Sequence, residues 1–151
     1  MNLTRRTAIL AAAATLIAPA AAFAKAKPVY TEGKIAIDGT DTVAYFDQGK
    51  PVPGSKKHKL QYNGSTWLFS TSENKAKFEA NPEAYAPQYG GYCAYAMARG
   101  AVAPTVPEAW RIVDGKLYLN FSKAIQKRWQ KDIPGEISKA NANWPRSLDD
   151  F

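Results

Sequence analysis

Residues 59–69 read KLQYNGSTWLF, and in this stretch two runs with large apolar residues flank Asn63-Gly64. An Asn-Gly pair favours a type I′ turn, because both central turn positions need a positive φ. The stretch therefore predicts a β-hairpin with strands at 59–62 and 65–69. A two-residue loop would place Leu60 opposite Trp67 as a cross-strand apolar pair.

A second hairpin is expected around Asp114-Gly115, with strands at 110–113 and 116–120. A short strand is predicted at 34–38, and another apolar run at 43–46 precedes a loop rich in Gly and Pro. Helices are predicted at 72–80, capped by Ser72, at 123–131, capped by Ser122, and at 136–142, with 92–99 as a further candidate ending at Gly100. This order of elements predicts an α+β fold, a small single domain of antiparallel hairpins packed with short helices.

The first 24 residues have the pattern of a cleaved signal peptide. Arg5-Arg6 form a positive head, residues 8–18 are apolar, and Ala22-Phe23-Ala24 provides a small-x-small cleavage site. The arginine pair is similar to a twin-arginine export signal. We therefore expect a periplasmic or secreted protein without a transmembrane anchor after cleavage. The mature chain would comprise a flexible leader at 25–33 and a folded domain at 34–151.

The charge and the cysteine count exclude several classes of function. The formal net charge is +7, and it falls to +5 once the two arginines of the signal peptide are removed. A basic balance can indicate nucleic-acid binding, but export argues against that partner. A single cysteine cannot form an intramolecular disulfide, so stability must come from burial. The chain has no Gly-rich phosphate loop and no CxxC or HExxH motif.

The only cysteine, Cys93, lies in the tract 85–100, YAPQYGGYCAYAMARG. If Gly90 and Gly91 open a helix, its unpaired amides would favour the Cys93 thiolate and raise its reactivity. The two glycines would also allow a small ligand to approach the backbone. Three tyrosines could line a pocket beside them, namely Tyr89, Tyr92 and Tyr95. The alternative interpretation is that Cys93 only fills space in the core.

Met97 follows Cys93 by four residues, so on a helix the two sulfur atoms would share one face. A thiolate and a thioether suit a soft ion such as cuprous copper, which makes Cys93 and Met97 candidate ligands of a copper-like transition metal. The only histidine, His58, would have to approach from a distant segment rich in lysine. Packing of Met97 in the core is the simpler interpretation.

Several motifs of the chain resemble the YHS domain proteins. They are DTVAYF at 41–46, YNGSTWLF at 62–69, SEN at 72–74, FEANPEAY at 78–85 and GGYCAYA at 90–96. The resemblance extends to an exported branch, the YHS domain-containing (seleno)proteins, and covers nearly all of the mature chain. It implies a small α+β domain related to metal-handling modules.

The resemblance places metal-binding cysteines at three positions that here are Ala44, Ser70 and Asn74. None of them carries sulfur, so that metal site is not expected in this chain. Some relatives are similar but carry selenocysteine in the segment that contains Cys93, which implies a redox or soft-metal role for this position. Two hypotheses follow. The protein is either a periplasmic accessory protein that binds a soft metal or a small ligand through Cys93, or a single-thiol oxidoreductase or peroxidase whose Cys93 is regenerated by a periplasmic redox partner.

Overall fold

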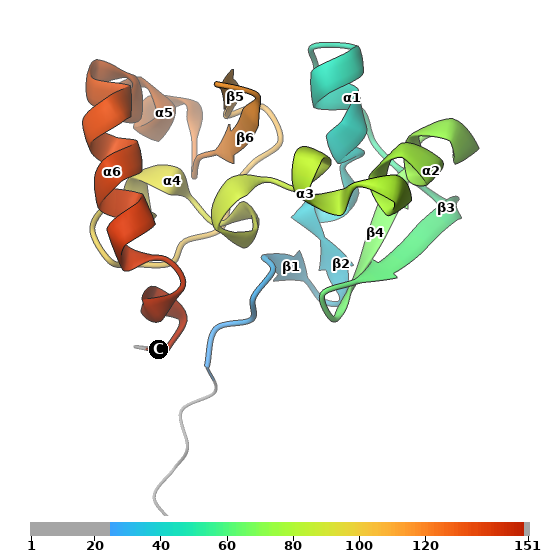
Figure 1. Cartoon of the computed structure of the whole chain (residues 1–151), viewed down its shortest axis with the longest axis horizontal. Coiled ribbons are helices and arrows are strands. Elements are labelled where there is room, and N and C mark those ends of the chain that lie inside the picture. The colour runs from blue at the N-terminus through green and yellow to red at the C-terminus, as the bar shows by residue number, and fades with distance from the viewer. Residues whose placement is uncertain (1–24, 150–151) are drawn as a thin grey trace, which may run out of the picture.

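The computed structural model describes residues 25–149. The predicted signal peptide, residues 1–24, lies outside the described residues, and so do residues 150 and 151. Figure 1 shows two groups of elements side by side, which we call the sheet lobe (residues 31–85) and the helical lobe (residues 92–149). None of the described helices is long and apolar enough to cross a membrane.

The sheet lobe contains a four-stranded sheet in the order β1-β2-β4-β3. Its strands are β1 (Thr31–Glu32), β2 (Ile35–Ala36), β3 (Ser55–Tyr62) and β4 (Ser65–Phe69). Neighbours are antiparallel except β2 and β4, which pair in parallel. The Asn63-Gly64 hairpin is confirmed, with φ values of 48° and 75° at the turn, and Leu60 lies opposite Trp67 as predicted.

Three short helices complete the sheet lobe: α1 (Thr42–Asp47), α2 (Ser72–Ala80) and α3 (Pro82–Tyr85). The apolar run 43–46 thus lies in a helix, because the Asp41 side chain caps it by accepting from the Val43 and Ala44 amides. The predicted cap of α2 was wrong by one residue. Thr71, not Ser72, accepts the hydrogen bond from the Asn74 amide.

The helical lobe contains α4 (Ala94–Met97), α5 (Lys123–Trp129) and α6 (Ile133–Asn143), together with the hairpin of β5 (Trp110–Val113) and β6 (Lys116–Leu119). This second hairpin and the Ser122 cap of α5 are confirmed. The predicted helix at 123–131 ends earlier, at Trp129, and continues as a 3₁₀ turn over Gln130–Asp132. The candidate helix at 92–99 shrinks to the single turn of α4, although Gly100 does follow it with a φ of 73°. The last helix starts at Ile133, earlier than expected.

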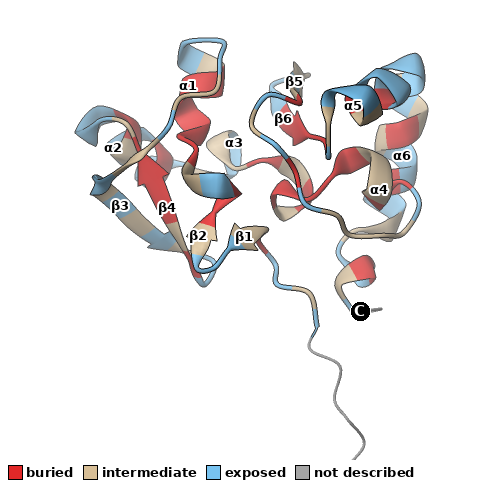
Figure 2. Ribbon diagram, turned by 180° about the vertical axis from the view of Figure 1, so that it is seen from behind, coloured by how far each residue is buried: buried red, intermediate tan, exposed pale blue. Residues whose placement is uncertain are grey.

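Strand β6 connects two hydrophobic cores. Leu117 and Leu119 pack into the core of the sheet lobe, with Trp67, Phe69 and Phe78 among its members. Tyr118 points the other way and packs in the core of the helical lobe against Trp129, at a ring-centroid distance of 5.5 Å. Alternate residues of a strand face opposite sides, so one short strand contributes to both cores. Figure 2 shows this buried strand between the two lobes.

Two expectations for the N-terminal part were wrong. The strand expected at 34–38 ends at Ala36, because the chain turns through a 3₁₀ segment (Ile37–Gly39) in which Ile37 and Asp38 both have a φ of 52°. The segment 25–33, expected to be a flexible leader, is packed against both lobes. Val29 is 2% exposed in the core of the sheet lobe, and the hydroxyl of Tyr92 in the helical lobe donates to the Lys27 carbonyl at 2.8 Å. Its apolar side chains therefore belong to the fold.

Candidate functional site

A fully buried carboxylate, that of Asp41, lies where α1, β4 and α2 meet. Its Oδ1 accepts from the amides of Val43 at 3.0 Å and Ala44 at 3.3 Å. Its Oδ2 accepts from Ser70 through both the amide, at 2.8 Å, and the hydroxyl, at 2.6 Å. The side-chain amide of Asn74 donates to the same oxygen at 2.8 Å. Five donors thus compensate the buried charge without a cation.

The donors Ala44, Ser70 and Asn74 occupy the three positions at which the resemblance to YHS proteins places metal-binding cysteines. The fold does bring these positions together, but around Asp41. Only one carboxylate is present there, its oxygens already accept five hydrogen bonds, and no sulfur ligand is available. These residues therefore do not fit a metal ion. Within residues 25–149 no group of three or more His, Cys, Asp or Glu side chains could hold one either.

The sequence analysis did not predict Asp41 as a site residue. A usable signal was present, since an Asp immediately before a Thr and an apolar run is the pattern of a helix N-cap. The convergence of Ser70 and Asn74 on Asp41 carried no such signal. They lie 29 and 33 positions away in the chain.

Cys93 is only 1% exposed and occupies the N-cap position of α4. The amide of Phe121 donates to its sulfur at 3.3 Å, and the thiol donates to Oδ1 of Asn120 at 3.6 Å. Asn120 is itself fully buried, and its Nδ2 has no hydrogen-bond partner among the described residues. The sulfur thus has polar neighbours, but it is buried and does not lie at the surface of a pocket.

The other residues of the predicted pocket do not converge on Cys93. Tyr92 donates its hydroxyl to the Lys27 carbonyl at 2.8 Å, and Tyr95 lies under the Arg99 guanidinium, 3.4 Å from the ring centroid. A side chain at Gly91 would collide with Ile37, so this glycine permits close packing. Tyr89 and Gly90 line a different cavity.

Met97, the second tentative metal ligand, is fully buried in the core of the helical lobe. It packs there with Trp129 and Ala140, as expected for a core methionine. The assignment of Cys93 and Met97 to a metal remains a prediction.

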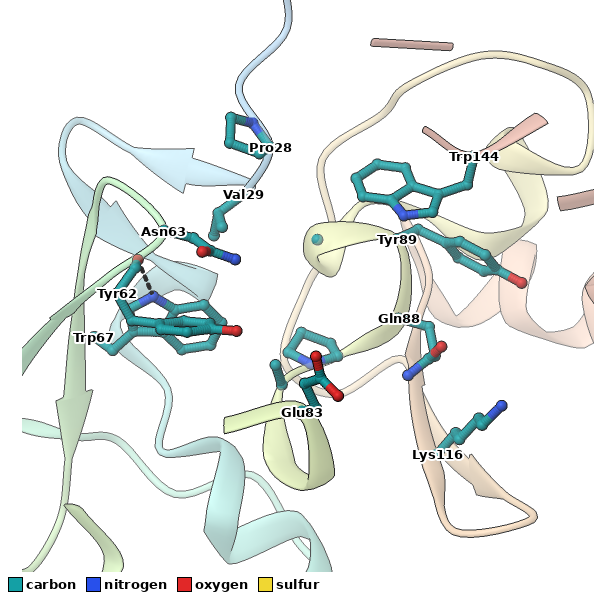
Figure 3. Close-up of a pocket in the computed structure, with 13 residues that line it drawn as sticks. Pro28, Val29, Tyr62, Asn63, Trp67, Glu83, Gln88, Tyr89, Lys116 and Trp144 are labelled. Atoms are coloured by element: carbon teal, nitrogen blue, oxygen red, sulfur yellow. Dashed lines mark hydrogen bonds between the residues drawn. The ribbon is translucent and has the colours of Figure 1, made fainter. Parts of the chain in front are cut away.

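A cleft of about 480 Å³ lies between the two lobes, and we call it the interlobe cleft (Figure 3). Tyr62 and Trp67 from the β3–β4 hairpin face Tyr89 and Trp144 across it. Polar groups lie among these rings, namely Asn63, Glu83, Gln88 and Lys116. Pro28 and Val29 of the N-terminal segment close one end.

Tight packing behind the cleft fixes its aromatic walls. The Trp67 indole donates to the Tyr62 carbonyl at 3.0 Å, and the two rings meet edge to face at 5.9 Å. On the opposite wall the Tyr89 hydroxyl donates to Oδ1 of Asn141 at 2.9 Å, and the Tyr89 ring meets Trp144 at 6.2 Å. Burial raises the pKa of Tyr89, so its hydroxyl stays neutral at physiological pH. The walls are therefore largely formed before any ligand binds.

Comparison with known proteins identifies one part of this architecture. The family model described as YHS domain matches residues 43–89. This part of the chain is therefore a YHS domain, which runs from α1 to the aromatic wall at Tyr89. The family has been associated with metal binding. Cys93 and Trp144 lie outside the matched residues. No curated protein and no solved structure gives a significant match to the chain.

Proposed function

We propose that this YHS-domain protein is an exported binding or accessory protein that holds a small organic ligand in the interlobe cleft. One observation carries the proposal. A preformed cavity of about 480 Å³ lies at the junction of the two lobes and takes aromatic walls from both. This volume falls in the range of about 300–1,000 Å³ that is usual for small-molecule sites.

The composition of the cleft supports an organic ligand over a metal ion. Aromatic rings in a cleft favour a ligand with an apolar or planar body, and Glu83 and Lys116 offer it one acidic and one basic anchor. Neither side chain forms an ion pair with another described residue, so both remain available to a ligand. The buried Asp41 cluster, by contrast, has no free donor set for a metal.

The test is a screen of small polar and aromatic compounds against the mature protein, followed by tryptophan fluorescence and thermal unfolding. Compounds that bind in the cleft should quench or shift fluorescence and raise the Tm, and Trp144→Ala and Glu83→Gln should reduce both effects. Glu79→Gln is the matched control, because Glu79 is an exposed acid of the neighbouring helix α2 that does not line the cleft. Hits that bind both cleft variants as tightly as the parent protein would contradict the proposal.

A second candidate function is thiol chemistry at Cys93, favoured by the Phe121 amide that donates to the sulfur. Peroxide would oxidise the thiolate to a sulfenic acid with release of hydroxide. One external thiol would then condense with the sulfenic acid to a mixed disulfide with release of water, and a second external thiol would free the Cys93 thiol as the two external sulfurs join in a disulfide. Peroxide treatment followed by mass analysis tests this, with Cys93→Ser as control. Tight stoichiometric uptake of cuprous ion that is lost in Cys93→Ser would instead support a soft-metal role.

The periplasm is the proposed compartment, supported by the signal-like residues 1–24. Expression of the full chain with a tag after Phe151 and fractionation of the cells test it. Recovery of a processed protein from the periplasm is expected, and replacement of Arg5-Arg6 by Lys-Lys should block export if the twin-arginine route is used. Retention of the unprocessed chain in the cytoplasm would contradict the proposed location.

A further inference from the structure

Two large apolar side chains stand out on the surface of the described residues, Val106 at 37% and Phe121 at 49% exposure. Both line the same hollow of about 360 Å³, which we call the Phe121 hollow. Tyr30 and Pro104 supply further apolar surface, and Glu32, Asp38 and Thr105 complete the lining. The coil from α4 to β5, which contributes Val106, crosses the face shown in Figure 2. Single exposed apolar residues are common, but two in one hollow suggest a contact surface.

The local structure does not require Phe121 to be apolar. Phe121 precedes the N-cap Ser122, where an apolar residue often packs against the fourth residue of the helix. That residue is Gln126, whose side chain donates instead to the Trp110 carbonyl at 2.6 Å. The usual structural reason for an apolar side chain at this position is therefore absent, and the Phe121 ring remains half exposed.

The backbone nevertheless holds the apolar pair in place. The Val106 amide donates to the Asn120 carbonyl at 3.2 Å, which joins the coil to the end of β6. The Phe121 amide donates to the Cys93 sulfur at 3.3 Å. A rigid apolar surface loses less conformational entropy when it binds a partner than a mobile one.

The hollow also has an acidic rim in a protein of positive net charge. Glu32 and Asp38 line it, and neither forms an ion pair with a described residue. Loss of hydration raises the pKa of Asp38, and the nearby charges of Glu32 and Glu108 also raise it, against the opposing effect of the Tyr30 hydroxyl, which donates to Oδ1 of Asp38 at 3.0 Å. Glu32 and Glu108 thus both repel the Asp38 carboxylate, and a cation from a partner would relieve that repulsion.

We propose that the Phe121 hollow is a docking surface for a protein segment that presents an apolar side chain next to a Lys or Arg. The apolar side chain would enter between Val106 and Phe121, and the cation would lie against Glu32 and Asp38. Charge complementarity selects this occupant over an acidic or purely apolar one. The proposal uses neither the interlobe cleft nor the chemistry of Cys93, so it can fail or succeed independently of both.

Selection from a phage-displayed library of random peptides, with the mature protein as bait, tests this surface. Enriched peptides should combine an aromatic or aliphatic residue with Lys or Arg. Phe121→Ser and Val106→Ser should each weaken the enriched peptides by about tenfold, because truncation of a central apolar contact has effects of this size. Glu32→Lys should mainly slow association. Glu79→Lys is a charge reversal on the exposed face of α2. It should change neither the affinity for the enriched peptides nor their association rate.

Thermal unfolding of each variant checks that the fold is intact, and the two serine variants provide independent tests of one hollow. Three results would overturn the proposal: no peptide is enriched, the enriched peptides are acidic, or binding is unaffected by both serine variants. Sedimentation velocity tests whether the hollow instead binds a second copy of this protein. A dimer of the mature protein that Phe121→Ser dissociates would also overturn it, because the surface would then serve self-association.

Discussion

The Asn74 side-chain amide donates to the Asp41 carboxylate at 2.8 Å, although the two residues are 33 positions apart in the chain. The contact joins the first turn of α2 to the N-terminus of α1, and Ser70, which directly follows β4, donates to the same oxygen. A hydrogen-bonded carboxylate therefore connects the three positions at which the YHS resemblance places metal ligands.

Asp41→Ala should be strongly destabilising. It would leave the buried donors of Ser70 and Asn74 without an acceptor, and we expect a loss of about 3 kcal/mol in the free energy of unfolding. Urea unfolding followed by tryptophan fluorescence measures it. Asp47→Ala is the control, because Asp47 pairs with Lys77 at the surface and should cost less than about 1 kcal/mol. Equal losses in the two variants would show that the buried cluster contributes no more to the free energy of unfolding than a surface ion pair does.

Metal removal should leave the stability of the fold unchanged. The Asp41 cluster is compensated by protein donors alone, so no ion is needed to hold α1, β4 and α2 together. Thermal unfolding of the mature protein before and after dialysis against a chelator is expected to give the same Tm. A fall in Tm that added copper or zinc restores would contradict the interpretation.

Asp38→Asn should stabilise the protein at neutral pH. The pKa of Asp38 is raised in the folded state, so the folded protein binds this proton more readily and gains stability as the pH falls through that pKa. Asn resembles the protonated form and tolerates the φ of 52° at this position. We therefore expect a higher Tm at pH 7 and no gain at pH 3, where Asp38 is protonated in both states.

Asp114→Asn controls for the backbone part of that effect, because Asp114 also has a positive φ, of 50°. A gain for Asp38→Asn that persists undiminished at pH 3 would indicate a backbone effect and not relief of charge repulsion.

Thiol labelling of Cys93 should be slow in the native protein and fast in denaturant. The residue is 1% exposed, so a bulky disulfide reagent reaches the sulfur only after local opening. The labelling rate should rise at least about a hundredfold in urea, in line with the free energy of opening a packed segment. Rapid native labelling would reveal an access route to the sulfur and would strengthen the thiol-chemistry hypothesis.

Local chemistry made much of the fold predictable. The two hairpins follow from Asn63-Gly64 and Asp114-Gly115, because few residue pairs accept a positive φ at both turn positions. The N-terminal ends of α2 and α5 follow from hydroxyl caps, with an error of one residue at Thr71. Predictions failed where tertiary contacts outweigh local preference. The alternating run 34–38 does not continue as a strand at Ile37, because the chain turns there and the Ile37 side chain is buried in the core. The segment 25–33 packs on the fold because Val29 is buried in the same core.

The sequence alone determined the α+β class and both hairpins, since turn chemistry, capping and apolar periodicity act within a few neighbouring residues. The resemblance to YHS proteins rests on matching motifs in the same sequence. Only the tertiary structure decided the site. It brought Ser70 and Asn74 to Asp41, covered Cys93, and set Tyr89 and Trp144 across a cleft from Tyr62 and Trp67. Those contacts join segments far apart in the chain. Their geometry depends on how the two lobes pack around β6, which no local pattern encodes.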